Sequence, residues 1–429
     1  MTGRTIERIH ARQILDSRGR PTVEVDVRLA DGTLGRASVP SGASTGTHEA
    51  HELRDGDPAD FAGLGVRRAV AAVDGEISAA LRGHDPADQR GIDAALRGLD
   101  GTANLTRLGA NAVLGTSLAV CRAAALAAGR PLYRHIAELA GVPAPVLPMP
   151  MVNILSGGLH AGRGMNVQDF LVVPASANTI GEALHQVAKV RAAASEVAAA
   201  RGLPTLLADE GGLSPGCPDS RTALELMVEI FATAGLEPGV DALIAIDVAA
   251  HSLAGPDGRY RFGREGVTRT TPEVIDLIEG WVRDFPVVSV EDGLDEEDWA
   301  GWTTLTARLG ERVTLIGDDL FTTNPARLTH GAALGAATGI LVKVNQNGTL
   351  SGTLDVLADA RAAGYVPVVS ARSGETEDDF LADLAVGTAA GQIKVGSLRC
   401  SDRLAKYNQL LRIAEDDRVP FAGAPGARS

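Results

Sequence analysis

The sequence contains few cysteines and few aromatic residues, and both shortages exclude classes of protein. Its three cysteines, Cys121, Cys217 and Cys400, lie far apart, and none forms a CxxC pair. They cannot form a disulfide framework or a zinc site, and they fit the reducing cytoplasm. Aromatic residues make up only 3% of the chain, which argues against stacking platforms for nucleic acid.

Long apolar runs and an excess of positive charge are also missing. The N-terminal stretch lacks the apolar core of a signal peptide, and no uninterrupted run of about 18 apolar residues occurs. The net charge of −14 disfavours non-specific binding to nucleic acid or to anionic membranes. We therefore expect a cytoplasmic protein that binds neither. An anionic substrate would need a pocket made positive by a metal ion or by a few Lys and Arg side chains.

The length and apolar content predict more than one domain. Hydrophobic residues make up 45% of the 429 residues, and length alone suggests two or three domains. Alternation of apolar and polar residues, as at residues 22–27, predicts half-exposed antiparallel strands. A Gly/Ser loop at residues 40–46 follows, and the Ala-rich stretch at 108–128 predicts a packed helix. We expect a small α+β cap domain at residues 1–135.

Residues 136–429 repeat a pattern of a short apolar run, a charged residue and a helical stretch, after a Pro-rich connection at 141–150. The runs, the first at residues 206–208, resemble parallel strands covered on both faces. The charged residues that follow lie 22 to 44 residues apart, which is about one strand–helix unit. They are Glu210, Asp247, Glu291, Asp318, Lys343, Arg372 and Lys394. We expect an α/β barrel over residues 136–429, with these charges on the rim where its strands end. A charge that merely ends a strand at the surface is the alternative for any one of them.

The residue types on this rim predict proton chemistry beside a metal ion. Asp247, Glu291 and Asp318 have no Cys or His at ligand spacing, and a set of oxygen ligands selects Mg²⁺ first and Mn²⁺ second. Lys343 would have its pKa lowered by burial and nearby cations, which would make it a base. Lys394 would bind a carboxylate or phosphate. Salt bridges among these residues are the competing interpretation.

Several long segments, in a fixed order, carry a resemblance to a known family. They read ILDSRGRPTVEV, VPSGASTGTHEA, LGANAVLGTSLAV, ADEGGLSP, IAIDVAA, SVEDGLDEEDW, GDDLFTTNP, LVKVNQNGTLS, RSGETEDDF, GQIK and RLAKYNQLLRI. In them the chain resembles the enolase (phosphopyruvate hydratase) family over nearly its whole length. The resemblance implies a dimer-forming N-terminal domain, or a higher homo-oligomer, and an enolase-type (β/α)8 barrel with irregular first units. It also implies the reversible dehydration of 2-phosphoglycerate to phosphoenolpyruvate.

The resemblance further implies a role for each site residue. Lys343 would be the general base and Glu210 the general acid at the leaving hydroxyl, helped by Asp169. Asp247, Glu291 and Asp318 would hold the tighter Mg²⁺. A second Mg²⁺ would be bound by Ser44 on a loop that closes over the substrate. The remaining substrate contacts would come from Arg372 and Ser373 to the phosphate, Lys394 to the carboxylate, and His160 beside the phosphate and hydroxyl.

The chain departs from the family motifs on one side of the expected site. Ala371 stands where the family has a histidine, and Asp169 where it has a glutamate, which is one methylene longer. The loop at residues 156–163 loses polar groups and gains Arg163, and residues 396–403 differ as well. The residues expected to remove the proton are unchanged. Our hypothesis is that enolate formation is retained while the departing group has changed, with ordinary drift in a working hydratase as an equal alternative.

Three other functions remain open at this point. One relative with such a profile is carboxyphosphonoenolpyruvate synthase, an enolase-like enzyme of phosphonate antibiotic pathways, and Arg163 with the space at Ala371 would suit its bulkier anionic donor. A catalytically silent enolase-like binding protein is disfavoured by the intact Lys343 and metal ligands. Another barrel lyase or racemase of the wider superfamily is disfavoured by the full-length match and the Ser44 loop.

Overall fold

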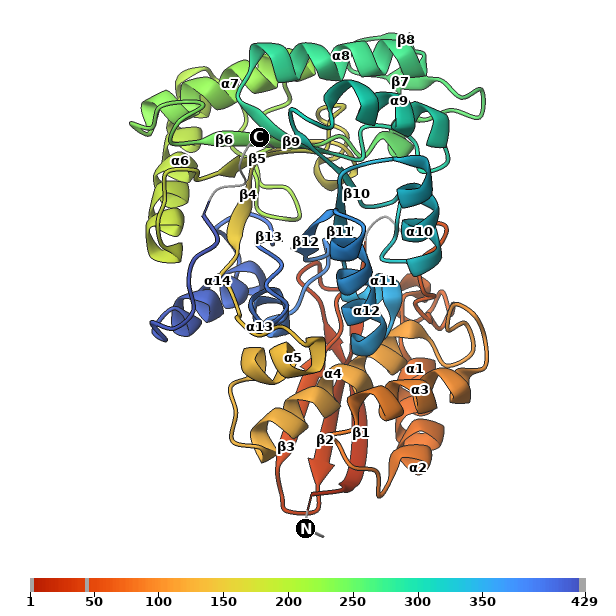
Figure 1. Cartoon of the computed structure of the whole chain (residues 1–429). Helices are drawn as coiled ribbons and strands as arrows, with labels where there is room; N and C mark the ends of the chain where they lie inside the picture. The colour runs from red at the N-terminus through yellow and green to blue at the C-terminus, as the bar shows by residue number, and fades with distance from the viewer. Residues whose placement is uncertain (1–3, 43–45, 424–429) are drawn as a thin grey trace.

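The N-terminal part of the chain is a three-stranded antiparallel sheet covered by helices (Figure 1, red to orange). The computed structural model describes residues 4–42 and 46–423. The strands β1 (Ile6–Leu15), β2 (Pro21–Leu29) and β3 (Leu34–Ser38) form a meander in sequence order. Val23, Val25 and Val27 of β2 are fully buried and alternate with less buried polar residues, which confirms the predicted strand pattern.

The helices of this part are α1 (Arg67–Ala72), α2 (Ser78–Leu81), α3 (Gln89–Asp100), α4 (Ala110–Ala127) and α5 (Leu132–Ala140). Helix α4 is the predicted Ala-rich helix, and it packs closely on the sheet. A Cβ atom on Gly35 of β3 would lie 2.3 Å from the carbonyl oxygen of Ala119, so only glycine allows this approach. α4 has the length and hydropathy of a membrane span, but 83% of it is buried inside the protein, as in a core helix.

The second part is a closed barrel of eight strands. Around the barrel the order is β10-β11-β12-β13-β4-β5-β6-β9, with β9 pairing β10. The strands are β4 (Met149–Ser156), β5 (Asp169–Val173), β6 (Leu243–Asp247), β9 (Val287–Glu291), β10 (Thr314–Gly317), β11 (Gly339–Val342), β12 (Val366–Ser370) and β13 (Gln392–Lys394). Met149, Leu171, Ile316 and Val368 belong to the apolar cluster that fills the interior.

Strand β5 runs antiparallel to both of its neighbours, whereas the other pairings in the barrel are parallel. Asp169 is its first residue and pairs with Asp247, the last residue of β6, and with Ser156, the last of β4. The reversed direction therefore brings the beginning of β5 to the rim where its neighbours end. This is the irregular first unit that the resemblance implies.

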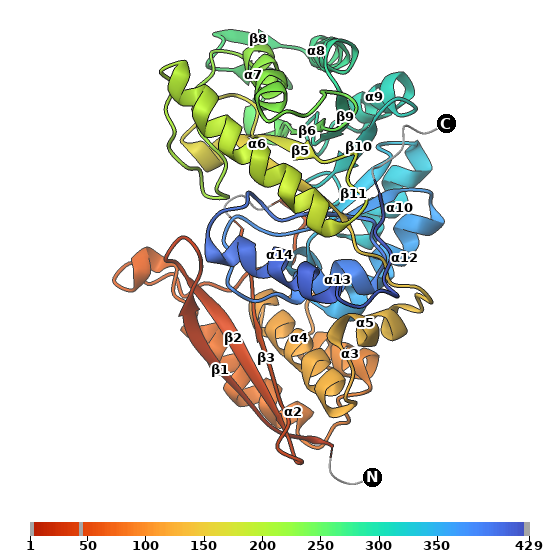
Figure 2. The same cartoon turned by 90° about the vertical axis from the view of Figure 1, so that its left-hand side faces the viewer.

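Helices cover the outside of the barrel (Figure 2). They are α6 (Ile180–Ala200), α7 (Ser220–Thr233), α8 (Thr271–Asp284), α9 (Trp299–Leu309), α10 (Pro325–Leu334), α11 (Val344–Asn347), α12 (Leu350–Ala362), α13 (Phe380–Gly387) and α14 (Ser401–Ile413). A small hairpin, β7 (Tyr260–Phe262) and β8 (Val267–Arg269), precedes α8. The N-terminal part lies against one side of the barrel, and a backbone bridge joins Ser41 to Gly374 there.

Two expectations about the barrel were wrong. Residues 206–208 are not a barrel strand, because Leu207 only bridges Leu213 and Leu206 is 74% exposed. Glu210 therefore reaches the rim from a loop. The predicted connection at 141–150 also extends too far, since β4 begins at Met149. Proline is tolerated inside β4 at Pro150, and this misled the composition-based boundary.

Candidate active site

The charged residues that follow the apolar runs converge on one rim of the barrel. Asp247, Glu291 and Lys394 are the last residues of their strands, and Asp318 and Lys343 directly follow theirs. A small cavity of about 30 Å³ opens among them. Its lining includes His160, Glu210, Asp247, Asp318, Lys343, Ala371, Arg372, Ser373 and Lys394.

The sequence has only four lysines, and two of them, Lys343 and Lys394, lie on this rim. Lys189 on α6 is exposed, whereas the side chains of Lys343 and Lys394 are 15% and 7% exposed, and Lys406 is 1% exposed. Most surface cations are therefore arginines. A buried ammonium group is costly unless it is paired, and Lys343, Lys394 and Lys406 each contact a carboxylate. The scarcity of lysine is readable in the sequence, although Lys343 and Lys394 were predicted from the strand ends alone.

Lys394 lies between two of the predicted metal ligands. Its amine donates to Asp247 Oδ2 at 2.8 Å and to both oxygens of Glu291 at 2.7 Å. Burial lowers the pKa of Lys394, but Asp247 and Glu291 outweigh burial and raise that pKa well above its usual value. Burial and the neighbouring Asp247 raise the pKa of Glu291. The three side chains are thus a tightly coupled buried cluster.

Lys343 contacts the third predicted metal ligand, Asp318, through its amine. Gln346 donates to the other oxygen of Asp318 at 3.0 Å, and Thr323 receives the backbone N–H of Lys343. We expected the pKa of Lys343 to be lowered, and the structure gives the opposite direction. Burial does lower it, but the contact with Asp318 is stronger and raises the pKa overall.

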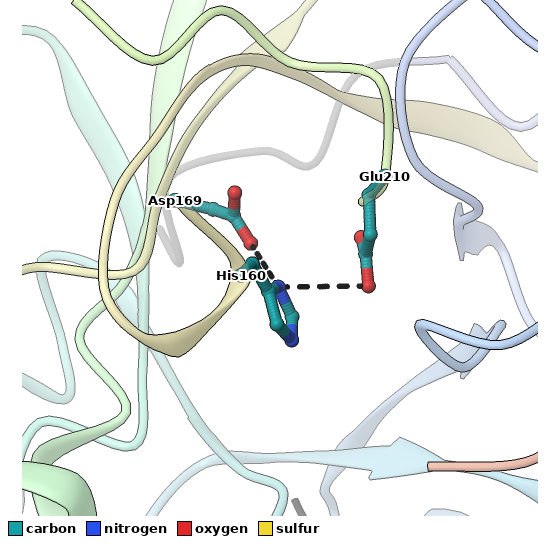
Figure 3. A group of neighbouring side chains, drawn as sticks. All are labelled: His160, Asp169 and Glu210. Atoms are coloured by element: carbon teal, nitrogen blue, oxygen red, sulfur yellow. Dashed lines mark ion pairs between the residues drawn. The ribbon is translucent and has the colours of Figure 1, made fainter. Parts of the chain in front are cut away.

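His160, Asp169 and Glu210 form a second group of neighbouring side chains, and His160 and Glu210 line the same cavity (Figure 3). His160 Nδ1 is 3.6 Å from Asp169 Oδ2 and 3.8 Å from Glu210 Oε1, beyond hydrogen-bond distance in both cases. Ser156 donates to Asp169 Oδ1 at 2.5 Å and Asn153 to Glu210 Oε2 at 3.3 Å. Among residues 4–42 and 46–423, no hydrogen-bond partner reaches the buried atoms His160 Nδ1 and Asp169 Oδ2.

The pKa values of this trio shift in different directions. Burial raises the pKa of Asp169. Burial also acts to raise the pKa of Glu210, but the charge of His160 and more distant cations lower it overall. Burial lowers the pKa of His160, yet Asp169 and Glu210 outweigh burial and raise it. A proton held by the trio therefore belongs on His160 or Asp169 before Glu210.

The predicted phosphate ligands Arg372 and Ser373 follow β12 and contact the N-terminal part of the chain. Arg372 Nη1 donates to Glu49 Oε2 at 2.8 Å and to Asn345 Oδ1 at 3.0 Å. Ser373 Oγ accepts from Arg18 Nη1 at 3.2 Å. Glu49 and Arg18 were not predicted, because nothing in a single sequence shows which residues of one domain face the other.

Two models of known families match this chain. The N-terminal domain of enolase matches residues 6–136, and the C-terminal TIM barrel domain of enolase matches residues 144–428. The chain belongs to the enolase family. Together with the closed barrel, these matches make it a lyase-type member of the enolase superfamily.

The acidic residues of this enolase-family rim could hold a metal ion. Oxygen atoms of Asp292, Asp318 and Asp319 lie within 4.8 Å of one another. Asp292, which has a positive φ of 42°, accepts the backbone N–H groups of Asp318 and Asp319 at 2.9 and 2.8 Å. Asp292 and Asp319 were not predicted as ligands, although each directly follows a predicted ligand. A carboxylate-only set of donors fits a hard divalent cation.

A buried arginine on α14 joins the segments that carry the site. Arg403 is fully buried, and its guanidinium donates to the backbone oxygens of Arg372 at 2.5 Å, Ser373 at 2.6 Å and Val395 at 3.1 Å. The carbonyl of Glu210 accepts from the backbone N–H of Ser397 at 2.8 Å. Arg403 therefore fixes the loop after β12 and the end of β13 relative to each other.

The remaining predicted site residue cannot be placed in the same way. Ser44, expected to close over the substrate and to bind a second Mg²⁺, lies outside the described residues. Its role remains a prediction from the resemblance.

Proposed function

We propose that the chain is an enolase-family lyase that removes the C2 proton of a 2-phosphoglycerate-like acid and gives phosphoenolpyruvate or an analogue. The observation that carries the proposal is the contact of the Lys343 amine with Asp318, in a buried cavity that Asp247 and Lys394 also line. A base next to carboxylates that hold a divalent cation is the arrangement that proton abstraction beside a carboxylate requires.

Asp247, Glu291 and Asp318 are proposed to hold Mg²⁺, which would stabilise the negative charge growing on the substrate carboxylate. A cation bound at Asp318 would also oppose the effect of this carboxylate on Lys343 and lower its pKa, the direction that a base needs. Lys394 would then turn from its carboxylate partners toward the substrate carboxylate. This turn is needed because the amine of Lys394 is bonded to Asp247 and Glu291 in the structure.

His160, Asp169 and Glu210 would complete the reaction. The electrons of the C2–H bond first enter the enediolate of the substrate carboxylate. They then form the C2–C3 double bond as the C3–O bond breaks, and the hydroxyl takes up a proton and leaves as water. Glu210 is proposed to deliver this proton, with Asp169 and His160 as its source. The raised pKa values of Asp169 and His160 support this order.

The decisive experiment uses 2-phosphoglycerate with Mg²⁺ and follows the ultraviolet absorbance of the enol product. In parallel, NMR in D₂O follows exchange of the C2 hydrogen. We expect exchange in the wild type, its loss in Lys343→Met, and unchanged exchange in the exposed control Lys189→Met. Absence of exchange in the wild type would refute the proposal.

A second candidate is favoured by one observation: Asp169 Oδ2 and His160 Nδ1 do not reach hydrogen-bond distance. The carboxylate shortened by one methylene, with Ala371 on the cavity wall, supports a changed departing group. The candidate is carboxyphosphonoenolpyruvate synthase. Normal C2 exchange with near-zero dehydration of 2-phosphoglycerate would favour it, whereas a dehydration rate like that of housekeeping enolases would remove it.

We further propose a cytoplasmic homodimer or higher homo-oligomer, as the resemblance implies. Analytical ultracentrifugation of the purified chain tests the oligomer directly. A monomer at all concentrations would contradict it.

A further inference from the structure

Glu49, a residue of the N-terminal part of the chain, forms an ion pair with the guanidinium of Arg372. Arg372 Nη1 donates to Glu49 Oε2 at 2.8 Å, and Nη2 to Oε1 at 3.3 Å. The two side chains are 7% and 3% exposed. This is a two-pronged contact between an arginine and an anion, buried away from solvent.

The same geometry is the one by which arginine binds phosphate. Paired N–H groups of a guanidinium match two oxygens of a carboxylate or of a phosphate equally well. A phosphate dianion brought to this face of Arg372 would meet the Glu49 carboxylate at close range. In a buried site two anions repel strongly, because little water screens them.

Glu49 is also connected to the metal side of the cavity and to its own segment. Gln346 donates to Glu49 Oε1 at 3.3 Å and to Asp318 Oδ1 at 3.0 Å. The backbone N–H of Gly46 donates to Glu49 Oε1 at 2.9 Å. A displacement of Glu49 would therefore break the Gly46 contact and free one donor of Gln346.

We propose that Glu49 is an internal competitor for the anion site of Arg372, and that the phosphate group of the substrate binds by displacing it. Glu49 thereby sets the specificity of the site, because a ligand with a single weak negative charge does not displace a carboxylate held by four donor groups from Arg372, Gln346 and Gly46. The inference rests on the proposed role of Arg372 as phosphate ligand.

The test measures binding of inorganic phosphate by isothermal titration calorimetry to the full-length protein. Glu49→Gln keeps the shape of the side chain and removes its charge, so we expect phosphate to bind on the order of tenfold more tightly than in the wild type. Glu52→Gln is the matched control. Glu52 lines a neighbouring cavity that Glu49 and Arg372 also line, and it contacts Arg54 and Ser41. Glu52→Gln replaces a carboxylate that does not contact Arg372 directly, so we expect a smaller gain in phosphate affinity.

Hydrogen–deuterium exchange gives a second reading that a purely structural role of Glu49 does not produce. Saturating phosphate is expected to accelerate amide exchange at Gly46 in the wild type, because its acceptor leaves. In Glu49→Gln the exchange at Gly46 should no longer respond to phosphate.

The outcomes separate this inference from the proposed function. Arg372→Lys should lose phosphate affinity, and if it binds like the wild type, Arg372 is not the phosphate ligand and both proposals about it fall. If Arg372→Lys loses affinity while Glu49→Gln binds phosphate no more tightly than Glu52→Gln, only the competitor inference is overturned. Thermal unfolding of each variant shows whether it is folded, and phosphate-dependent stabilisation provides the same ranking if calorimetric heats are small.

Discussion

Two groups of side chains around the cavity make their contacts in different ways. On the side of Lys343 and Lys394, each predicted metal ligand is contacted by an ammonium group. On the side of His160, three titratable groups approach one another without a hydrogen bond among them, and two of their polar atoms have no hydrogen-bond partner in the described part of the chain. The contacts of the first group are satisfied, whereas the second group contains Asp169, where the resemblance implies a longer acid. We therefore propose that any change of function in this chain affects what leaves the substrate and not how its proton is removed.

Loss of the proposed base, Lys343, should give the largest effect, and it tests the group of side chains whose contacts are satisfied. Lys343→Met is expected to reduce C2 hydrogen exchange by about 10²–10⁴, because the proposed general base is removed. NMR in D₂O measures the rate. Asp318 then remains buried without its ammonium partner, so the free energy of unfolding should fall by about 3–5 kcal/mol in the absence of metal. Exchange at the wild-type rate would assign the base to another residue.

Glu210→Gln should separate the two sides. Dehydration, followed by ultraviolet absorbance, is expected to fall by about 10²–10⁴ because the leaving hydroxyl loses its acid. Exchange at C2 should persist within about a few-fold of the wild type, since Lys343 and its partners are untouched. Equal losses of both activities would show that the two sides act as one unit.

Asp169→Glu should sharpen the comparison by restoring the missing methylene. A longer side chain brings its carboxylate within hydrogen-bond distance of His160 Nδ1, which is 3.6 Å from Asp169 Oδ2 in the present structure. We expect faster dehydration of 2-phosphoglycerate, on the order of tenfold, with C2 exchange unchanged. A slower reaction would mean that the chain is adapted to a substrate for which the shorter acid is required.

The pH dependence of His160 should give the smallest effect. Burial lowers its pKa, but Asp169 and Glu210 raise it overall, so its protonated form is stabilised by folding. This contribution to the free energy of unfolding is present in full below the unfolded-state pKa of about 6.5 and is lost as pH rises through the raised folded-state value. NMR titration of the His160 ring measures the folded pKa. Asp169→Asn should lower it, and an unchanged value would contradict the assigned cause.

The rim residues were predictable because parallel strands leave a strong pattern in sequence. Asp247, Glu291, Lys343 and Lys394 were placed correctly at strand ends from short apolar runs alone. The same rule misplaced Glu210, because residues 206–208 are apolar yet form a loop.

Other parts of the site leave no such pattern. The residue pattern of β5 does not show in which direction the strand runs. The placement of Asp169 at the rim was therefore predicted only from the resemblance. Contacts across the two parts of the chain, such as Glu49 with Arg372, depend on docking that one sequence does not encode locally. The raised pKa of Lys343 likewise follows from a pairing with Asp318 that residue types alone do not specify.

The reversed direction of β5 ties the chemistry to the length of one loop. Asp169, Leu171 and Val173 share the inward face of this strand, since alternate residues point the same way and Leu171 and Val173 belong to the interior cluster. Sliding β5 by one position against β6 would turn Phe170 inward and point the acid at the surrounding helices. Insertions between Ser156 and Asp169 are therefore tolerated only if the loop absorbs them completely. The loop can change its sequence or bulge outward, provided that the register of β5 stays the same.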